Sequence, residues 1–131
     1  MNLGDSLSKT VVRDIMSKQL ISADPSTTLF QIAKLMEQGV GAILIKKDSI
    51  PAGIITDRDF AIKVAANKYS LDSTVDKVAS YPLKTIKPDE SVLKAAEMMA
   101  SLKIRKLVVM DNQEIVGIIT STDVVKLVAS I

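Results

Sequence analysis

Two residue pairs in this chain of 131 residues have the types and spacing of a chemical site. Thr56 and Asp59 lie in the stretch GIITDRD, and Thr120 and Asp123 lie in its near-copy GIITSTD. A Thr three residues before a carboxylate is typical of a helix start, because each side chain bonds the backbone amide of the other residue. Helix capping therefore explains the Thr and the Asp, but it does not explain why the whole stretch occurs twice.

The residue types that are absent exclude several kinds of chemistry. The sequence has no Cys, no His and no Trp. Disulfides, thiolate nucleophiles, histidine bases and zinc sites built from Cys and His are therefore excluded. The two Tyr and two Phe give few surfaces on which single-stranded nucleic acid could stack. We predict a protein that is not an enzyme and has neither a metal site nor a bound cofactor.

Composition favours one compact unit. The hydrophobic fraction is 47% and the net charge is only +2, from 17 basic and 15 acidic residues. This balance does not favour nonspecific binding to nucleic acid. No apolar run approaches the roughly 18 residues of a membrane span, and residues 1–10 lack the apolar core of a secretory signal. We expect a cytoplasmic protein that does not bind membranes.

The repeated stretch belongs to a longer internal repeat. The segment LISADPSTTLFQIAKLM, which begins at Leu20, aligns with LKTIKPDESVLKAAEMM, which begins at Leu83. The offset is 83 − 20 = 63 residues here and 117 − 53 = 64 residues at Gly53 and Gly117. The chain is therefore two copies of one pattern, and the second copy gains one residue.

Each copy contains the elements that must position its Thr and Asp. Apolar residues recur at helical spacing from Leu29 to Met36 and from Val92 to Met99. Two β-branched runs follow each helix; we expect turns at DSIP and NQE between them, and a last helix after each GIIT. Each copy therefore reads β-α-β-β-α. We place the copies at residues 10–66 and 73–130, opened by the short segments 10–16 and 73–79, with residues 67–72 as the linker.

This doubled pattern resembles the paired cystathionine-β-synthase (CBS) domain, or Bateman module. The resemblance rests on VRDIM near the start, the tandem β-α-β-β-α unit and the two closing stretches, and it covers roughly residues 10–130. It implies an α+β fold whose two repeats pack with pseudo-twofold symmetry. It also implies clefts between the two motifs that bind adenine nucleosides and nucleotides.

The resemblance assigns roles to particular residues. The family uses the carboxylate of its Ser/Thr-x-x-Asp pattern to hold a ribose diol, which corresponds to Thr56 with Asp59 and to Thr120 with Asp123. The free amides of the helix start suit phosphate. The adenine base is expected against the short first strand of each copy. The matching positions are Ile21, Ser22, Ala23, Lys84, Thr85 and Ile86, which read equally well as ordinary strand residues.

The two copies differ in charge near these positions. The second copy has KIRK before its second strand, where the first has GVGA. Arg105 and Lys106 are therefore candidates to bind phosphate, or they are simply solvated. Conversely, Arg58 in the first closing stretch corresponds to Thr122 in the second. We predict two inequivalent sites, although the sequence does not tell which basic residue completes which site.

The function that follows is that of a regulatory sensor. The resemblance implies binding of AMP, ADP, ATP or a relative such as S-adenosylmethionine, with a conformational change that signals to a regulated partner protein. It also implies a homodimer of CBS pairs. Two alternatives stay open: a scaffold or interaction subunit that binds no ligand, and a nucleic-acid-binding protein, for which KIRK is the only local support.

Overall fold

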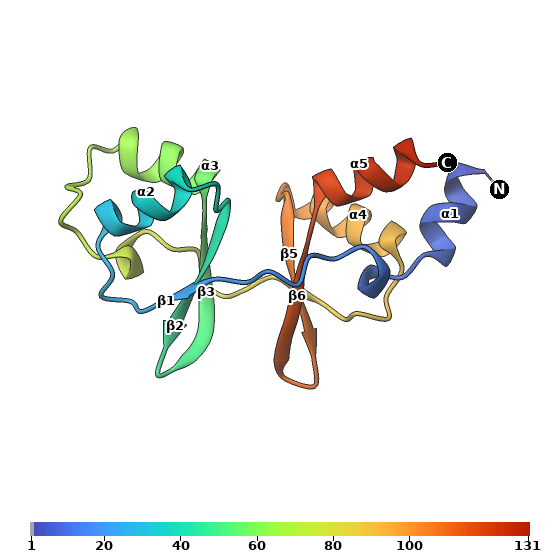
Figure 1. Cartoon of the computed structure of the whole chain (residues 1–131), viewed down its shortest axis with the longest axis horizontal. Helices are drawn as coiled ribbons and strands as arrows, with labels where there is room; N and C mark the ends of the chain where they lie inside the picture. Colours follow the sequence, from blue (N-terminus) through green and yellow to red (C-terminus); the bar gives the residue numbers. More distant parts are fainter. Residues whose placement is uncertain (1) are drawn as a thin grey trace. The chain divides into compact units, whose positions relative to one another are not determined.

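Two three-stranded sheets organise the computed structural model, which describes residues 2–131 (Figure 1). The strand orders are β1-β2-β3 and β4-β5-β6. In each sheet the first strand is parallel to the second, and the second is antiparallel to the third. The predicted α+β class and the doubled β-α-β-β-α order are confirmed.

The two repeats have the same order of elements. The first contains β1 (Ser22–Ala23), α2 (Leu29–Glu37), β2 (Ala42–Lys47), β3 (Ile50–Thr56), α3 (Asp57–Asp59) and the π-helix η2 (Phe60–Ala65). The second contains β4 (Thr85–Ile86), α4 (Val92–Leu102), β5 (Lys106–Asp111), β6 (Glu114–Thr120) and α5 (Ser121–Ala129). The helix α1 (Leu3–Lys9) and the 3-10 helices η1 (Val12–Asp14) and η3 (Val75–Lys77) complete the chain. None of the helices within residues 2–131 is long and apolar enough to cross a membrane.

The hairpin turns are tighter than predicted. Asp48 and Ser49 alone connect β2 to β3, and Asn112 and Gln113 alone connect β5 to β6. All four residues have positive φ, as the two-residue turns that match the twist of a hairpin require. The expectation that the turns extend over DSIP and NQE is therefore wrong. Pro51 is accepted in β3 because it lies on an edge strand beside a register shift.

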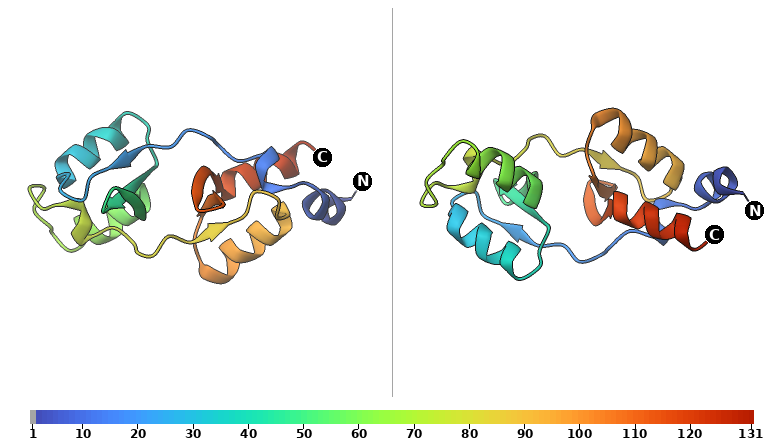
Figure 2. Two further views of the ribbon diagram at one scale, coloured as in Figure 1. Left: turned by 90° about the horizontal axis from the view of Figure 1, so that it is seen from below. Right: turned by 90° about the horizontal axis from the view of Figure 1, so that it is seen from above.

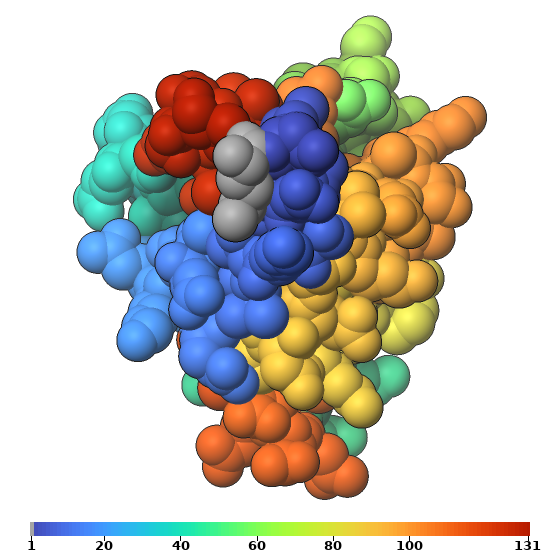
Figure 3. Space-filling view, turned by 90° about the vertical axis from the view of Figure 1, so that its right-hand side faces the viewer, coloured from blue at the N-terminus to red at the C-terminus, as the bar shows by residue number. Residues whose placement is uncertain are grey.

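The two compact units of the structure do not coincide with the two sequence repeats. One unit comprises residues 1–19 and 84–131, and the other comprises residues 20–83. We call them the split unit and the continuous unit. The segment that opens each repeat packs against the body of the other repeat, and Figures 2 and 3 show the blue segment of the split unit beside gold residues of the second repeat.

Backbone hydrogen bonds hold these opening segments in place. In the split unit Val12 N donates to Glu90 O at 2.8 Å, and Val92 N donates to Thr10 O at 2.8 Å. In the continuous unit Val75 N donates to Thr27 O at 2.8 Å, and Leu29 N donates to Ser73 O at 2.9 Å. The two attachments are equivalent, so each segment 10–16 or 73–79 stabilises the opposite repeat.

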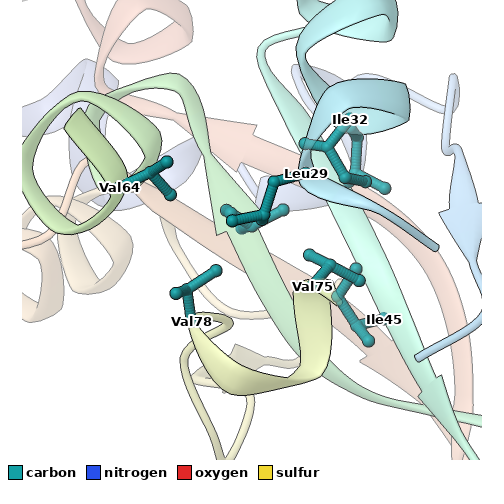
Figure 4. Packing of buried hydrophobic residues seen from close by; sticks show 8 residues of the cluster. Leu29, Ile32, Ile45, Val64, Val75 and Val78 are labelled. Atoms are coloured by element: carbon teal, nitrogen blue, oxygen red, sulfur yellow. The ribbon is translucent and has the colours of Figure 1, made fainter. Parts of the chain in front are cut away.

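Each unit has its own hydrophobic core. In the continuous unit the buried residues come from α2, β2, β3, η2 and the segment around η3. Figure 4 shows Leu29, Ile32 and Val75 among them. The split unit buries Val12 with residues of β4, α4, β5 and β6. Val12 and Val75 have no exposed surface, so the opening segments are parts of these cores.

Candidate ligand-binding site

The first predicted pair, Thr56 and Asp59, forms a complete capping box at the start of α3. Thr56 Oγ1 accepts a hydrogen bond from Asp59 N at 3.1 Å, and Thr56 N donates to Asp59 Oδ2 at 3.1 Å. Both residues are half-buried. Because β3 ends at Thr56, the strand delivers the two side chains to the beginning of the helix.

The second pair, Thr120 and Asp123, makes the same box at the start of α5 with one additional bond. Asp123 N donates to Thr120 Oγ1 at 3.2 Å, and Thr120 N donates to Asp123 Oδ2 at 2.9 Å. Thr120 Oγ1 also lies 3.0 Å from Asp123 Oδ2 and donates its hydroxyl proton to it. The hydroxyl of Thr120 is therefore committed to Asp123, unlike the hydroxyl of Thr56.

Both carboxylates keep an oxygen for another partner. The capping boxes use only Oδ2 of Asp59 and of Asp123. Within residues 2–131, Oδ1 of either residue accepts no hydrogen bond. A carboxylate oxygen can accept two hydrogen bonds, so each site can still receive hydroxyl donors from a ligand. Capping and ligand binding are therefore compatible.

The positions predicted to hold a base lie on the short parallel strands. Leu44 N donates to Ile21 O at 2.9 Å, and Val108 N donates to Lys84 O at 3.1 Å, so the two segments occupy equivalent places beside β2 and β5. Their side chains differ in burial. Ile21, Ser22 and Lys84 are exposed, Ala23 and Thr85 are half-buried, and Ile86 is buried in the core of the split unit.

The basic candidates of the second repeat lie beside its Thr and Asp. Ser121 N, at the first position of α5, donates to Arg105 O at 2.9 Å, and Lys106 pairs with Thr120 in the sheet. In the continuous unit Gly41 takes the place of Arg105, because Asp57 N donates to Gly41 O at 3.2 Å. Arg58 is exposed on α3. The two sites thus have different charges around equivalent carboxylates.

Two hollows lie elsewhere in the units. A groove of about 660 Å³ in the split unit is bordered by the loop 87–90, the start of α4 and the tip of the β5-β6 hairpin, and it contains Thr85 and Ile86. A hollow of about 470 Å³ in the continuous unit lies between η2 and the residues after η3. Neither Thr–Asp pair lines either of them. Residues 2–131 contain no group of three acidic residues that could hold a metal ion.

The sequence did not indicate that another segment of the same chain crosses β3 and β6. Ile54 N donates to Ser80 O at 3.1 Å and accepts through its own carbonyl from Ser80 N at 2.8 Å. Ile118 and Ser17 make the same pair of bonds in the split unit. These contacts occur two residues before Thr56 and Thr120. The only sequence signal was the repeated Gly that precedes each Ile, which leaves room for the crossing chain.

Comparison with known proteins gives a consistent family. The family model for the CBS domain matches the chain twice, over residues 12–66 and 75–130. The CBS domain-containing protein YhcV of Bacillus subtilis is 34% identical over 113 residues, which cover 86% of this chain and 81% of that protein. Three further curated relatives are longer, and the chain spans 61%, 41% and 66% of them. One longer relative is named for an enzyme activity, and the chain spans 26% of it.

Solved structures share the fold. An uncharacterized conserved protein from Pyrococcus horikoshii superposes with a TM-score of 0.86 at 26% identity, over 94% of this chain and 93% of that one. The CBS domain pair of protein MJ0100 superposes with a TM-score of 0.80 at 30% identity, over 92% of this chain and 97% of that one. The latter structure is a complex with 5′-methylthioadenosine and S-adenosyl-L-methionine.

Proposed function

The chain belongs to the CBS domain family, as a regulatory module with two CBS motifs, and we propose that it senses an adenosine-type ligand through Asp59 and Asp123. In this proposal each carboxylate accepts hydrogen bonds from the ribose hydroxyls. AMP, ADP, ATP and S-adenosylmethionine all present this diol. The proposal assigns no catalytic step to the chain.

The observation that carries the proposal is the unused carboxylate oxygen of each aspartate. A residue needed only for capping would be served as well by a side chain with a single acceptor, as Gln31 serves at the start of α2. Asp59 and Asp123 each offer a second oxygen at the end of a strand, where backbone amides of a helix start are also near. The ligands of the MJ0100 pair support an adenosine compound as the ligand class.

The proposed sites prefer different members of this ligand class. The second repeat has three basic residues in this region, where the first repeat has Gly41, Ala42 and Ile21. Arg105 lies beside the first residue of α5, Lys106 pairs with Thr120, and Lys84 lies next to β5 just before β4. The site at Asp123 therefore suits a ligand with phosphates, because Arg and Lys bind phosphate oxygens with charge-assisted hydrogen bonds. The site at Asp59 has Arg58 alone and an uncommitted Thr56 hydroxyl, which suits a ligand with less negative charge.

Signalling requires only that the ligand bind one conformation of the module more tightly than another. The ligand would then shift the populations of the two conformations and change the surface offered to a regulated protein. We infer that this output acts through another chain or through a homodimer of CBS pairs.

Titration calorimetry against adenosine, AMP, ADP, ATP, NAD and S-adenosylmethionine tests the proposal. A ligand at 100 times its Kd should also raise the free energy of unfolding by about 2.7 kcal/mol, which is several degrees in Tm. Asp59→Asn and Asp123→Asn should each weaken binding at one site by about tenfold or more, because the amide keeps one acceptor for the cap and loses the second.

Gln31→Ala is the matched control, since it breaks a capping box of the same kind outside the proposed site. It should lower stability and leave binding unchanged. If no ligand in the panel binds the wild-type protein, the chain is a scaffold or interaction subunit instead. If a ligand binds equally well to both Asn variants, the ribose assignment is wrong. Salt-dependent binding of RNA or DNA without nucleotide binding would favour the nucleic-acid alternative.

A further inference from the structure

We propose that the hollow between η2 and the residues after η3 is a separate binding site for a phosphate group. Its lining residues share the continuous unit and are Lys63, Asn67, Tyr69, Lys77, Val78 and Ala79. None of them belongs to the Thr56–Asp59 pair or to β1, so the proposal does not depend on the adenosine ligand proposed above.

The lining of the hollow favours an anion. Two of its side chains are lysines, Tyr69 adds a hydroxyl, and no lining residue is acidic. Within residues 2–131 neither Lys63 nor Lys77 forms an ion pair. The nearest acidic residue along the chain is Asp76, whose carboxylate accepts a hydrogen bond from the Thr74 hydroxyl. Two lysines that form no ion pair within residues 2–131 therefore line the hollow.

Lys63 is held in position by the protein itself. Its ammonium donates to Ser80 Oγ at 2.9 Å and to Val78 O at 3.2 Å, and both acceptors are neutral. An ammonium group has three N–H donors, so one is left for a ligand. Lys63 is half-buried, and its charge would gain from a counter-ion more than the charge of a fully solvated lysine. The geometry thus preorganises one donor without using its charge.

The elements around the hollow place both lysines along it. Val64 and Val78 point into the core of the continuous unit (Figure 4), and their neighbours Lys63 and Lys77 line the hollow. Asn67 Nδ2 donates to Lys63 O at 3.0 Å and to Ile62 O at 3.4 Å. The amide therefore occupies carbonyl oxygens at the end of the helix that would otherwise repel an anion.

The second repeat lacks the equivalent feature. Its residue at the position of Lys63 is Leu127, on the regular helix α5. The chain equivalent to Ser80 is Ser17, and it makes the same backbone pair with its strand but receives no lysine within the part of the chain that is described. The cationic hollow is therefore a property of the continuous unit and not a consequence of the fold.

Phosphate fits these donors better than a carboxylate does. Its oxygens point in tetrahedral directions, so separate oxygens can accept from the Lys63 ammonium, the Lys77 ammonium and the Tyr69 hydroxyl. The phosphate could be free inorganic phosphate or the phosphate group of a larger metabolite. These two sources share the same chemistry and are separated by the experiment.

An NMR titration of the amide signals tests the site, with sodium phosphate compared to sodium chloride at equal ionic strength. We expect saturable phosphate-dependent shifts at Lys77, Val78 and Ala79. Lys77→Met should weaken phosphate binding about tenfold, because it removes one charge-assisted hydrogen bond. Lys68→Met is the control, since it removes the same charge from an exposed residue that does not line the hollow.

Lys63→Met is a second variant with the same expected loss, and the exposed Lys77 decides the result if Lys63→Met alters the fold. Adding AMP and adenosine separates the sources of phosphate: if AMP shifts these three amides and adenosine does not, a phosphorylated metabolite can occupy the site. Shifts caused equally by chloride would overturn the proposal. Equal weakening by Lys68→Met and Lys77→Met would also overturn it, because general screening of charge would then explain the binding.

Discussion

Gly53 and Gly117 show what single residues contribute beyond the Thr–Asp pairs. A Cβ added to Gly53 would lie 2.5 Å from a ring atom of Tyr81 and 2.9 Å from Ser80 O. At Gly117 it would lie 2.7 Å from Met16 Sδ and 2.8 Å from Ser17 O. The glycine in each GIIT is therefore required for the close approach of another part of the chain.

The position of Tyr81 in the folded chain changes the pKa of its hydroxyl. Although 42% of Tyr81 is exposed, partial desolvation raises the pKa of its hydroxyl above the usual value, and the negative charge of Asp76 raises that pKa further. Folding favours the protonated form, so any stability gained from Tyr81 is present below pH 10 and is lost as the pH rises through its folded-state pKa.

We predict that Gly53→Ala and Gly117→Ala each lower the free energy of unfolding by roughly 1–3 kcal/mol, because the added methyl group must displace backbone as well as side chain. Urea denaturation measures the change. Gly4→Ala is the control, since its Cβ would make an ordinary contact 3.5 Å from Asn2 Oδ1 and alanine favours the helix. Wild-type stability in Gly53→Ala would contradict the close approach.

At the scale of elements, the sequence predicted best where periodicity is strong. The apolar stripes from Leu29 and Val92 became α2 and α4, and the β-branched runs became paired strands in both repeats. Their repetition made each assignment support the other. The turns were placed too long because Pro51 favours a turn and Glu114 is polar, although both belong to strands. The positive φ of two adjacent residues, which makes each turn short, is a backbone property that the sequence did not reveal.

The candidate site was predictable in part. The two capping boxes follow directly from the Thr-x-x-Asp spacing, and the structure contains both. Arg105 was a candidate through the family resemblance, but its backbone bond to α5 was not predicted, because it depends on which carbonyl the Ser121 amide meets when the strands pair. The role of Lys63 was also hidden, since its partners lie 15 and 17 residues away along the chain.

The π-helix η2 and its lysine distinguish the first repeat from the second. Its end is closed by Tyr69 N, which donates to Val64 O five residues earlier at 3.1 Å. Lys63 links this helix to Val78 and Ser80, and Ser80 is paired with Ile54 of β3. The helix that follows Asp59 is therefore tied to the segment that crosses its own strand.

We predict that Lys63→Met loosens this crossing segment. It removes two hydrogen bonds, which should cost about 1–2 kcal/mol and speed hydrogen exchange at the amides of Ile54 and Ser80. The Ile118–Ser17 pair of the split unit serves as an internal reference, because within residues 2–131 no lysine donates a hydrogen bond to Ser17. Unchanged exchange at Ser80, or equal acceleration at Ser17, would show that Lys63 does not hold the segment.

At the scale of the whole molecule, the chain builds each unit from both sequence repeats. The split unit takes η1 from the segment that opens the first repeat, and the continuous unit takes η3 from the segment that opens the second repeat. The boundaries at residues 10–66 and 73–130 therefore describe the repeated pattern, whereas the packed units are residues 20–83 and residues 1–19 with 84–131. Sequence similarity alone could not reveal this exchange, because both opening segments have the same pattern and either repeat could accept either one.

This exchange predicts that two equivalent valines stabilise opposite repeats. Val12 precedes the first repeat but is buried with Leu107, Val109 and Ile119, whereas Val75 precedes the second repeat and is buried in the continuous unit. Val12→Ala and Val75→Ala should each cost about 2 kcal/mol, from two lost methyl groups and the cavity left behind. Hydrogen exchange followed by mass spectrometry locates the effect.

Exchange should accelerate in β4, β5 and β6 for Val12→Ala, and in β1, β2 and β3 for Val75→Ala. The two variants are controls for each other, because the substitution, the complete burial and the local 3-10 helix are the same. If each valine instead affected the sheet that follows it in the sequence, the opening segments would pack on their own repeats and the exchange would be wrong. The expected pattern instead means that a change in the segment that opens either repeat destabilises the other repeat first.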